Sequence, residues 1–190
     1  MKKILLIGDS IRLGYDKWVA DALKDRAQVY FPKENCEYAE NVLRFLHEWV
    51  SADGLGANLD VIHWNAGLWD CLRLFGDDPM TPIEVYGSYI TRIQKRIVRL
   101  FPNAVSIFAA STPIREEKYS PDFRRYNAEI EAYNAAARKA LEGTGARIDD
   151  LYAVMKDVPV SCYSDATHFY TPEGTEIIGS AVLNSILAVL

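Results

Sequence analysis

A chain of 190 residues, 49% hydrophobic and 25% charged, is long enough for one domain with a sizeable core and short for two. Its formal net charge of -5 argues against a nucleic-acid partner, because neutralising phosphates needs a basic surface. No apolar run is long enough to span a bilayer, and the apolar run 4–7 is too short for a signal peptide. We therefore expect no membrane association and a cytoplasmic protein, or a mature secreted form whose leader has been removed.

Short apolar segments alternate with helical patterns along the chain. The predicted strands cover residues 3–7, 27–31, 59–64, 104–109 and 146–148. The predicted helices cover residues 14–26, 39–50, 83–100, 123–141 and 149–155, and a last helix follows Thr171 as its N-cap, with Pro172 at the first helical position. A long polar loop is expected over residues 111–124. This alternation predicts a parallel sheet with right-handed crossovers, and one three-layer α/β/α domain over residues 1–190.

Polar residues stand where the predicted strands end. Ser10 follows the first strand, Asn65 follows the third, and a polar cluster over residues 164–168 precedes the last helix. The carboxyl ends of parallel strands share one edge of a sheet, which is where ligands and catalytic groups collect in α/β proteins. We therefore expect these residues to converge.

Three histidines are present, and only His168 lies in a loop at this edge. Asp165 stands three residues before it, so a single turn can bring the carboxylate to the imidazole Nδ1 and leave Nε2 free as a base. The alternative is that Asp165 is a turn residue and His168 a half-exposed helix-entry residue. We expect His63 to be a core or supporting residue and His47 to lie at the surface.

Ser10 alone could simply cap the following helix. A serine becomes a nucleophile when a base accepts its proton, and the Asp165–His168 pair can supply that base. The residues around the serine, Gly8-Asp9-Ser10-Ile11-Arg12, are not Gly-x-Ser-x-Gly, which argues against the α/β-hydrolase elbow.

Gly8-Asp9-Ser10 after the first strand, with Asp165-Ala166-Thr167-His168 before the last helix, resembles the GDSL/SGNH hydrolase superfamily over essentially the whole chain. The superfamily comprises esterases, lipases, thioesterases and carbohydrate deacetylases. The resemblance implies a flavodoxin-like α/β/α sandwich whose parallel sheet has about five strands. It also implies Ser10 as nucleophile, His168 as general base and then acid, and Asp165 as the residue that orients His168.

The middle of the chain departs from that family pattern. Where the third block usually reads Gly-x-Asn-Asp, this chain has Gly-Leu-Trp-Asp over residues 67–70, with Trp69 at the position of the asparagine that donates to the oxyanion. We expect Asn65 to replace it, although Asn65 could merely turn the chain. The second block lacks its usual glycine, so the backbone N–H of Cys36 or Glu37 is the expected oxyanion donor there. The backbone N–H of Ser10 is the third expected oxyanion donor.

Other side chains near these loops have ordinary structural explanations. The three cysteines follow no disulfide or metal spacing and are expected to be reduced packing residues: Cys36, Cys71 and Cys162. Surface charge is the expectation for three arginines: Arg12, Arg73 and Arg115. Packing is the simplest role for Tyr15, Tyr38 and Trp64. Trp69, which lies in the third block, is the exception and could face a substrate.

These features predict a serine esterase that hydrolyses a small acyl ester, acetyl above all, on an alcohol or a sugar, through an acyl-serine intermediate. The expected partner is a small-molecule ester, with no metal and no organic cofactor; the oligomeric state stays open. A flavodoxin-like module that binds phosphate or a nucleotide on the loop 8–14 is the alternative from another class. A third alternative is a protein with the hydrolase fold that has lost its catalytic activity.

Overall fold

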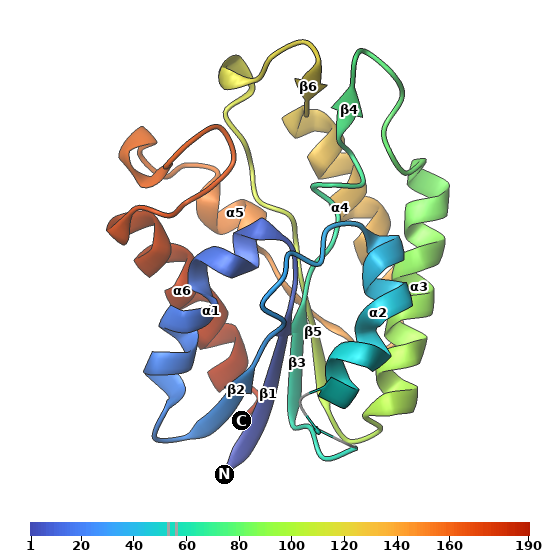
Figure 1. Cartoon of the computed structure of the whole chain (residues 1–190), viewed down its shortest axis with the longest axis vertical. Helices are drawn as coiled ribbons and strands as arrows, with labels where there is room; N and C mark the ends of the chain where they lie inside the picture. Colours follow the sequence, from blue (N-terminus) through green and yellow to red (C-terminus); the bar gives the residue numbers. More distant parts are fainter. Residues whose placement is uncertain (53, 56) are drawn as a thin grey trace.

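A computed structural model describes residues 1–190 except residues 53 and 56. Its centre is a parallel sheet with the strand order β2-β1-β3-β5-β7 (Figure 1). The strands have these bounds: β1 (Lys2–Ile7), β2 (Ala27–Tyr30), β3 (Val61–Trp64), β5 (Val105–Ala109) and β7 (Arg147–Asp149). This is the flavodoxin-like order, with its reversal between β1 and β3. The prediction of a five-stranded parallel sheet is confirmed.

Helices cover both faces of the sheet and complete three layers. Their bounds are α1 (Ser10–Leu23), α2 (Ala39–Ala52), α3 (Ile83–Leu100), α4 (Asn127–Leu141), α5 (Leu151–Met155) and α6 (Pro172–Leu187), with the short 3₁₀ helices η1 (Glu116–Lys118) and η2 (Val160–Cys162). Helices α1, α5 and α6 lie on one face, and α2, α3 and α4 lie on the other (Figure 1). None of the helices in the described residues is long and apolar enough to cross a membrane.

The central strand shows why the sequence folds this way. In β1 the side chains of Ile4, Leu5, Leu6 and Ile7 are all fully buried, as a strand covered by helices on both faces requires. The last helix begins as expected, since the Thr171 hydroxyl accepts a hydrogen bond from the Gly174 N–H at 3.1 Å.

Three helices begin elsewhere than predicted. Helix α5 starts at Leu151, two residues late, because the Asp150 side chain caps it by accepting the Ala153 N–H. Helix α1 starts at Ser10, four residues early, because the Asp9 side chain caps it by accepting the Ile11 N–H at 2.9 Å. Helix α4 starts late, because residues 123 and 124 form a strand instead. That strand, β6 (Phe123–Arg124), pairs antiparallel with β4 (Arg73–Leu74). Neither strand was predicted, since two residues carry no readable alternation.

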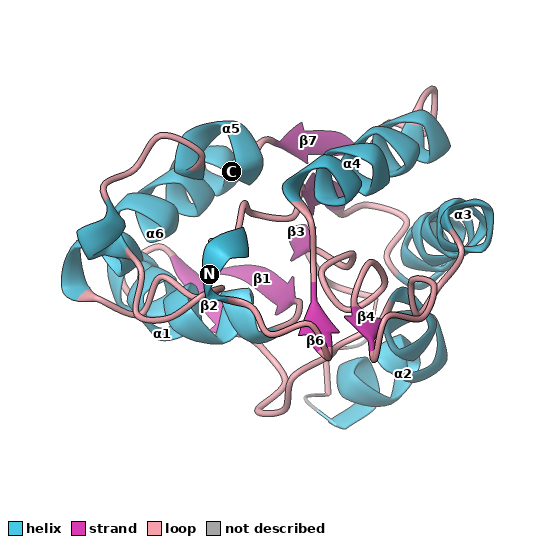
Figure 2. Cartoon of the chain, turned by 90° about the horizontal axis from the view of Figure 1, so that it is seen from above, coloured by secondary structure: helices cyan, strands magenta, loops and turns pink. Residues whose placement is uncertain are grey.

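The sheet register places the site. Strands β1 and β3 pair with Ile7 opposite Trp64, so the residues that follow them, Gly8–Ser10 and Asn65, leave the sheet side by side. Seen from above (Figure 2), β4 and β6 lie next to each other over this carboxyl edge. The three cysteines are free and buried, which agrees with the sequence prediction.

Candidate active site

The structure brings Ser10, His168 and Asp165 into one chain of hydrogen bonds. The Ser10 hydroxyl lies 2.8 Å from Nε2 of His168, and Nδ1 of His168 lies 2.7 Å from Oδ2 of Asp165. Because an ionised carboxylate can only accept, Nδ1 carries the proton and Nε2 is left to accept the hydroxyl proton of Ser10. The arrangement is that of a nucleophile, a base and the group that orients the base.

The Asp165 turn is built locally. Its Oδ1 accepts the N–H groups of Thr167 at 2.7 Å and His168 at 2.9 Å, while Oδ2 faces the imidazole. Partial burial by itself raises the pKa of Asp165, but these two N–H groups and the imidazole together hold that pKa below its usual value. The carboxylate is therefore ionised at neutral pH and stabilises a positive charge on His168.

Ser10 occupies the first position of helix α1. Its N–H has no hydrogen-bond partner among the described residues, as expected at a helix N-terminus. Asp9 before it is fully buried, and Oδ2 of Asp9 also lacks a partner in the described residues. Burial raises the pKa of Asp9 above its usual value.

The Asn65 side chain has a fixed orientation beside the nucleophile. Its Oδ1 accepts the Asp9 N–H at 3.3 Å, and its amide opposes the rise that burial causes in the pKa of the Asp9 carboxyl, without a close hydrogen bond from Nδ2 to any described residue. The asparagine is 5% exposed. Gly8 is needed here, because a Cβ at that position would lie 1.9 Å from Oδ1 of Asn65. Asn65 thus offers an N–H donor next to Ser10.

The second block does not supply the expected donor. The Cys36 N–H donates to the Gly8 carbonyl at 3.1 Å, and the Glu37 N–H donates to Oδ1 of Asn35 at 2.9 Å. Asn35 forms a local side-chain turn that competes for the Glu37 N–H. Glu37, assigned to the oxyanion hole from the sequence, therefore has no free N–H in this structure, and the same holds for Cys36. Glu37 adopts a left-handed backbone, with φ at +51°, which glycine tolerates more readily than other residues.

Arg12 is fully buried, so the prediction that it is a surface charge is wrong. Its Nη1 pairs with Asp16 at 2.7 Å and donates to the Pro32 carbonyl at 2.8 Å, and its Nη2 donates to the Glu34 carbonyl at 2.6 Å. Asp70 holds the neighbouring loop by accepting the Ala39 N–H. Arg12 and Asp70 thus bond the segments that follow β1, β2 and β3 to one another, and these segments hold the loop that carries the nucleophile.

The other two arginines expected at the surface, and His63, have structural partners. Arg73 pairs with Glu129 at 2.7 Å and Arg115 pairs with Glu117 at 2.8 Å. His63 is buried and its Nε2 lies 2.9 Å from Asp149, which agrees with its prediction as a core or supporting residue.

Two of the aromatic residues are partly exposed and two belong to the core. Trp69 and Tyr38 pack edge to face with their ring centroids 5.6 Å apart, and both are partly exposed. Trp64 and Tyr15 are fully buried below the site.

Tyr170 is a site residue that sequence reasoning missed. Its ring stacks on the imidazole of His168, with centroids 4.6 Å apart and planes at 23°, and its hydroxyl donates to the Ser10 carbonyl. Gly14 makes room for the ring, since a Cβ there would lie 2.6 Å from it. An aromatic residue two positions after His168 was the available signal.

Arg125 is the second residue that was missed. It is 4% exposed, its Nε donates to the Leu68 carbonyl, and its Nη1 donates to the Tyr119 hydroxyl at 3.2 Å. The Tyr119 hydroxyl also contacts the Thr167 hydroxyl. These bonds connect the third-block loop with the loop that carries His168.

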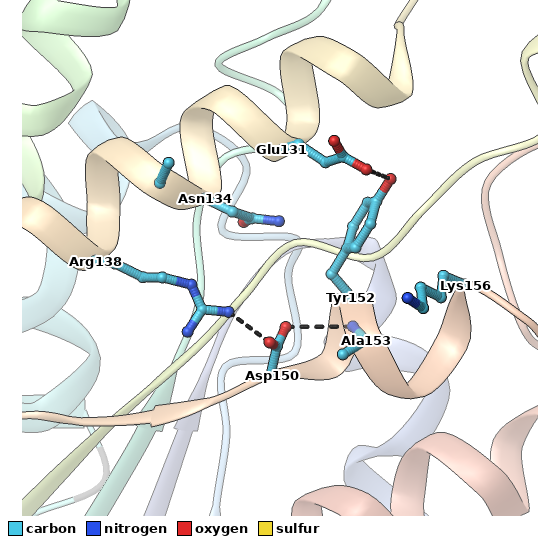
Figure 3. A pocket seen from close by; sticks show the side chains of 8 residues that line it. Glu131, Asn134, Arg138, Asp150, Tyr152, Ala153 and Lys156 are labelled. Carbon is cyan, nitrogen blue, oxygen red and sulfur yellow. Dashed lines mark hydrogen bonds and ion pairs between the residues drawn. The ribbon is translucent and has the colours of Figure 1, made fainter.

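A hollow of about 270 Å³ between α4 and α5 lies outside this site (Figure 3). None of the predicted site residues lines it. Two pairs of its polar groups bond each other: Arg138 pairs with Asp150 at 2.7 Å, and the Tyr152 hydroxyl donates to Glu131 at 2.7 Å. Among the described residues, no three His, Cys, Asp or Glu side chains are grouped so that they could hold a metal ion.

No protein-family model and no curated protein matches the sequence. Solved structures match over nearly the whole chain. A lipase/acylhydrolase from Enterococcus faecalis aligns with a TM-score of 0.76 at 18% identity, covering 99% of this chain and 96% of its own. A GDSL-like lipase from Bacteroides thetaiotaomicron aligns with a TM-score of 0.76 at 15% identity, covering 100% of this chain and 89% of its own. An acetyl xylan esterase from Geobacillus stearothermophilus aligns with a TM-score of 0.73 at 16% identity, covering 97% of this chain and 94% of its own. The chain therefore has the fold of the GDSL-like lipases and acylhydrolases of the GDSL/SGNH superfamily.

Proposed function

We propose that this protein is a serine hydrolase that cleaves carboxylic esters with Ser10 as its nucleophile. The observation that carries the proposal is the unbroken path from the Ser10 hydroxyl through His168 to Asp165, at 2.8 and 2.7 Å. A serine hydroxyl is a poor nucleophile by itself, and this path supplies the base that activates it. The shared fold with lipases, acylhydrolases and an acetyl xylan esterase supports the same reaction class.

In the proposed reaction the Ser10 oxygen attacks the ester carbonyl while His168 takes the hydroxyl proton. The negative charge on the carbonyl oxygen is held by the Ser10 N–H and the Asn65 Nδ2 amide, the two free donors beside the nucleophile. His168 then gives its proton to the leaving alcohol, and an acyl-Ser10 ester remains. Water activated by His168 attacks that ester, the acid leaves, and the proton returns to Ser10.

A small acyl group, with acetyl as the first candidate, fits the proposal best. The turn before Ser10 is bonded to the loops that follow β2 and β3, through the Cys36 N–H to the Gly8 carbonyl and the Asp9 N–H to Asn65. The Tyr170 ring packs on His168. Trp69 and Tyr38 stand beside the site with partly exposed rings, and such faces pack well against a sugar. An acetylated alcohol or sugar is therefore the proposed substrate class.

The phosphate-binding alternative meets an electrostatic obstacle. A phosphate at the N-terminus of α1 would face the buried side chain of Asp9, which already caps the helix through the Ile11 N–H. An ionised Asp9 would repel the phosphate, and a protonated one would still occupy the cap. The hydrogen bond between Ser10 and His168 has no role in that reading.

The test is hydrolysis of p-nitrophenyl acetate together with labelling by a fluorophosphonate probe. We expect Ser10→Ala and His168→Ala to lose at least a thousandfold in kcat, and the label to attach to Ser10 and to be absent from Ser10→Ala. His47→Ala is the matched control, because His47 is exposed on α2, and it should keep the wild-type rate. Variants of Ser10 and His168 that keep the wild-type rate would refute the proposal.

A further inference from the structure

Arg125 is a buried cation with unused hydrogen-bonding capacity. Of its five N–H groups, one donates to the Leu68 carbonyl and one to the Tyr119 hydroxyl. Both partners are neutral, and no carboxylate in the described part of the chain pairs with the guanidinium. The terminal Nη2 has no partner there, yet it is not sealed from solvent. Three N–H groups are thus free to bind a ligand.

Arg12 shows how this chain treats a buried arginine with a structural role. Its guanidinium pairs with the Asp16 carboxylate and also donates to the carbonyls of Pro32 and Glu34. Arg125 is nearly as enclosed, at 4% exposed, but it forms no ion pair; the buried Asp9 carboxyl feels its charge only through space, and burial keeps the pKa of Asp9 raised. Burying a charge is costly unless the charge is paired, so the missing anion requires an explanation.

Aromatic rings surround the Arg125 guanidinium and leave it in an ordered position. Its central carbon lies 5.7 Å from the Trp69 ring centroid, 5.3 Å from that of Phe123 and 5.9 Å from that of Tyr119. Such contacts stabilise a cation in part and hold its plane, but they provide no negative charge. A planar donor held in place is suited to a carboxylate.

The position of Arg125 ties it to the proposed active site. Its Leu68 contact belongs to the loop that follows Asn65, and Trp69 is the next residue. On its other side, the Tyr119 hydroxyl contacts Thr167, the residue before His168. Arg125 directly follows β6, which lies over the carboxyl edge of the sheet in Figure 2. The guanidinium therefore lies between the loops that carry the oxyanion donor and the base.

We propose that Arg125 binds a carboxylate on the alcohol part of the ester substrate. The inference rests on the proposed function: an acyl group as small as acetyl has no room for a charged group, so the anion must belong to the alcohol part. The carboxylate would supply the charge that Arg125 lacks and would orient the ester over Ser10. The substrate class is thus narrowed from acetyl esters in general to acetyl esters of hydroxy acids or acidic sugars.

The test compares 3- and 4-acetoxybenzoate with their methyl esters, two isomers whose carboxylates lie at different distances from the acetyl group. We expect wild type to favour at least one acid over its methyl ester by about tenfold or more in kcat/KM. Arg125→Gln should bring that ratio close to one, a loss of about tenfold or more, and Arg125→Lys should keep part of it. Arg124→Gln removes a neighbouring charge that lies over the Tyr126 ring, and should leave the ratio within twofold.

A second measurement needs no catalysis. In the Ser10→Ala background, calorimetry should show tighter binding of the favoured acid than of its methyl ester, and the difference should disappear when Arg125→Gln is added. A ratio of about one in wild type for both isomers, or equal losses in Arg125→Gln and Arg124→Gln, would overturn the carboxylate site. Failure of wild type to hydrolyse any of these esters refutes the proposed function instead, and the binding measurement then decides on Arg125 alone. If Arg125→Gln does not fold, Arg125→Lys and the loss of wild-type preference in high salt take its place.

Discussion

Removing the Asn65 amide should slow hydrolysis strongly while the protein stays folded. The structure leaves two free oxyanion donors, the Ser10 N–H and the Asn65 Nδ2, because those of the second block are engaged. Losing one such donor typically costs about 3–4 kcal/mol of transition-state stabilisation, or roughly 10²–10³ in kcat. Asn65→Ala should show this loss with little change in KM. It also leaves the Asp9 N–H without its 3.3 Å acceptor, which costs about 1 kcal/mol of stability.

Asn65→Asp separates the two roles of the side chain. The carboxylate can still accept the Asp9 N–H, but it has no N–H to donate and places a negative charge where one develops in the reaction. Its kcat should therefore fall at least as far as that of Asn65→Ala. Asn134→Ala is the matched control, a buried asparagine whose side chain bonds the Ser111 backbone at 2.8 and 2.9 Å. It should lose stability and keep kcat within about threefold.

The assay is steady-state hydrolysis of p-nitrophenyl acetate, combined with urea denaturation of each variant. The two measurements distinguish a lost donor from a damaged fold. A folded Asn65→Ala variant with kcat within threefold of wild type would show that Asn65 only turns the chain. The oxyanion would then have to be held by the Ser10 N–H and by a donor freed when the second-block loop rearranges.

Three further changes test other parts of the site. Tyr170→Leu removes the ring that stacks on His168 and should lower kcat about tenfold, whereas Tyr170→Phe should lose less; stopped-flow acylation checks this. Burial raises the pKa of Asp70 from 3.8 to about 6, so the folded state holds that proton more tightly and stability falls as pH rises through this range. The unfolding free energy of Asp70→Asn should therefore rise by up to about 3 kcal/mol relative to that of wild type between pH 4 and pH 7. A difference in unfolding free energy that stays constant over this range would contradict this. Glu37→Gly should raise the unfolding free energy by about 1 kcal/mol in urea, because glycine adopts φ +51° without strain, while Glu37→Ala should not.

The layers of the fold were readable from the sequence because each β–α unit carries its own pattern. The apolar run of β1 and the cap at Thr171 are local signals, and they fix where a parallel sheet and its last helix lie. The pairing of Asp165 with His168 was also accessible, since three residues of separation suffice for one turn to join them.

What escaped prediction depends on contacts between distant residues. Arg12 is two positions from the nucleophile, and nothing in the sequence shows that the carbonyls of Pro32 and Glu34 converge on it. The pairing of β4 with β6 joins segments some fifty residues apart through two residues each. Arg125 is placed by that pairing, so its relation to the site was equally hidden. The donor of the second block depended on where the Asn35 side chain turns, which composition does not specify.

The hydrogen bond between Ser10 and His168 joins residues 158 positions apart, and this separation makes the first and last elements of the chain interdependent. Helices α1 and α6 lie against each other so closely that a Cβ on Gly179 would come within 2.6 Å of the Trp18 ring. The nucleophile is held by one of these helices and the base by the turn that enters the other. Only molecules in which the C-terminal helix has docked can therefore hydrolyse the ester. The rate of turnover would thus measure the fraction of the population that has completed folding.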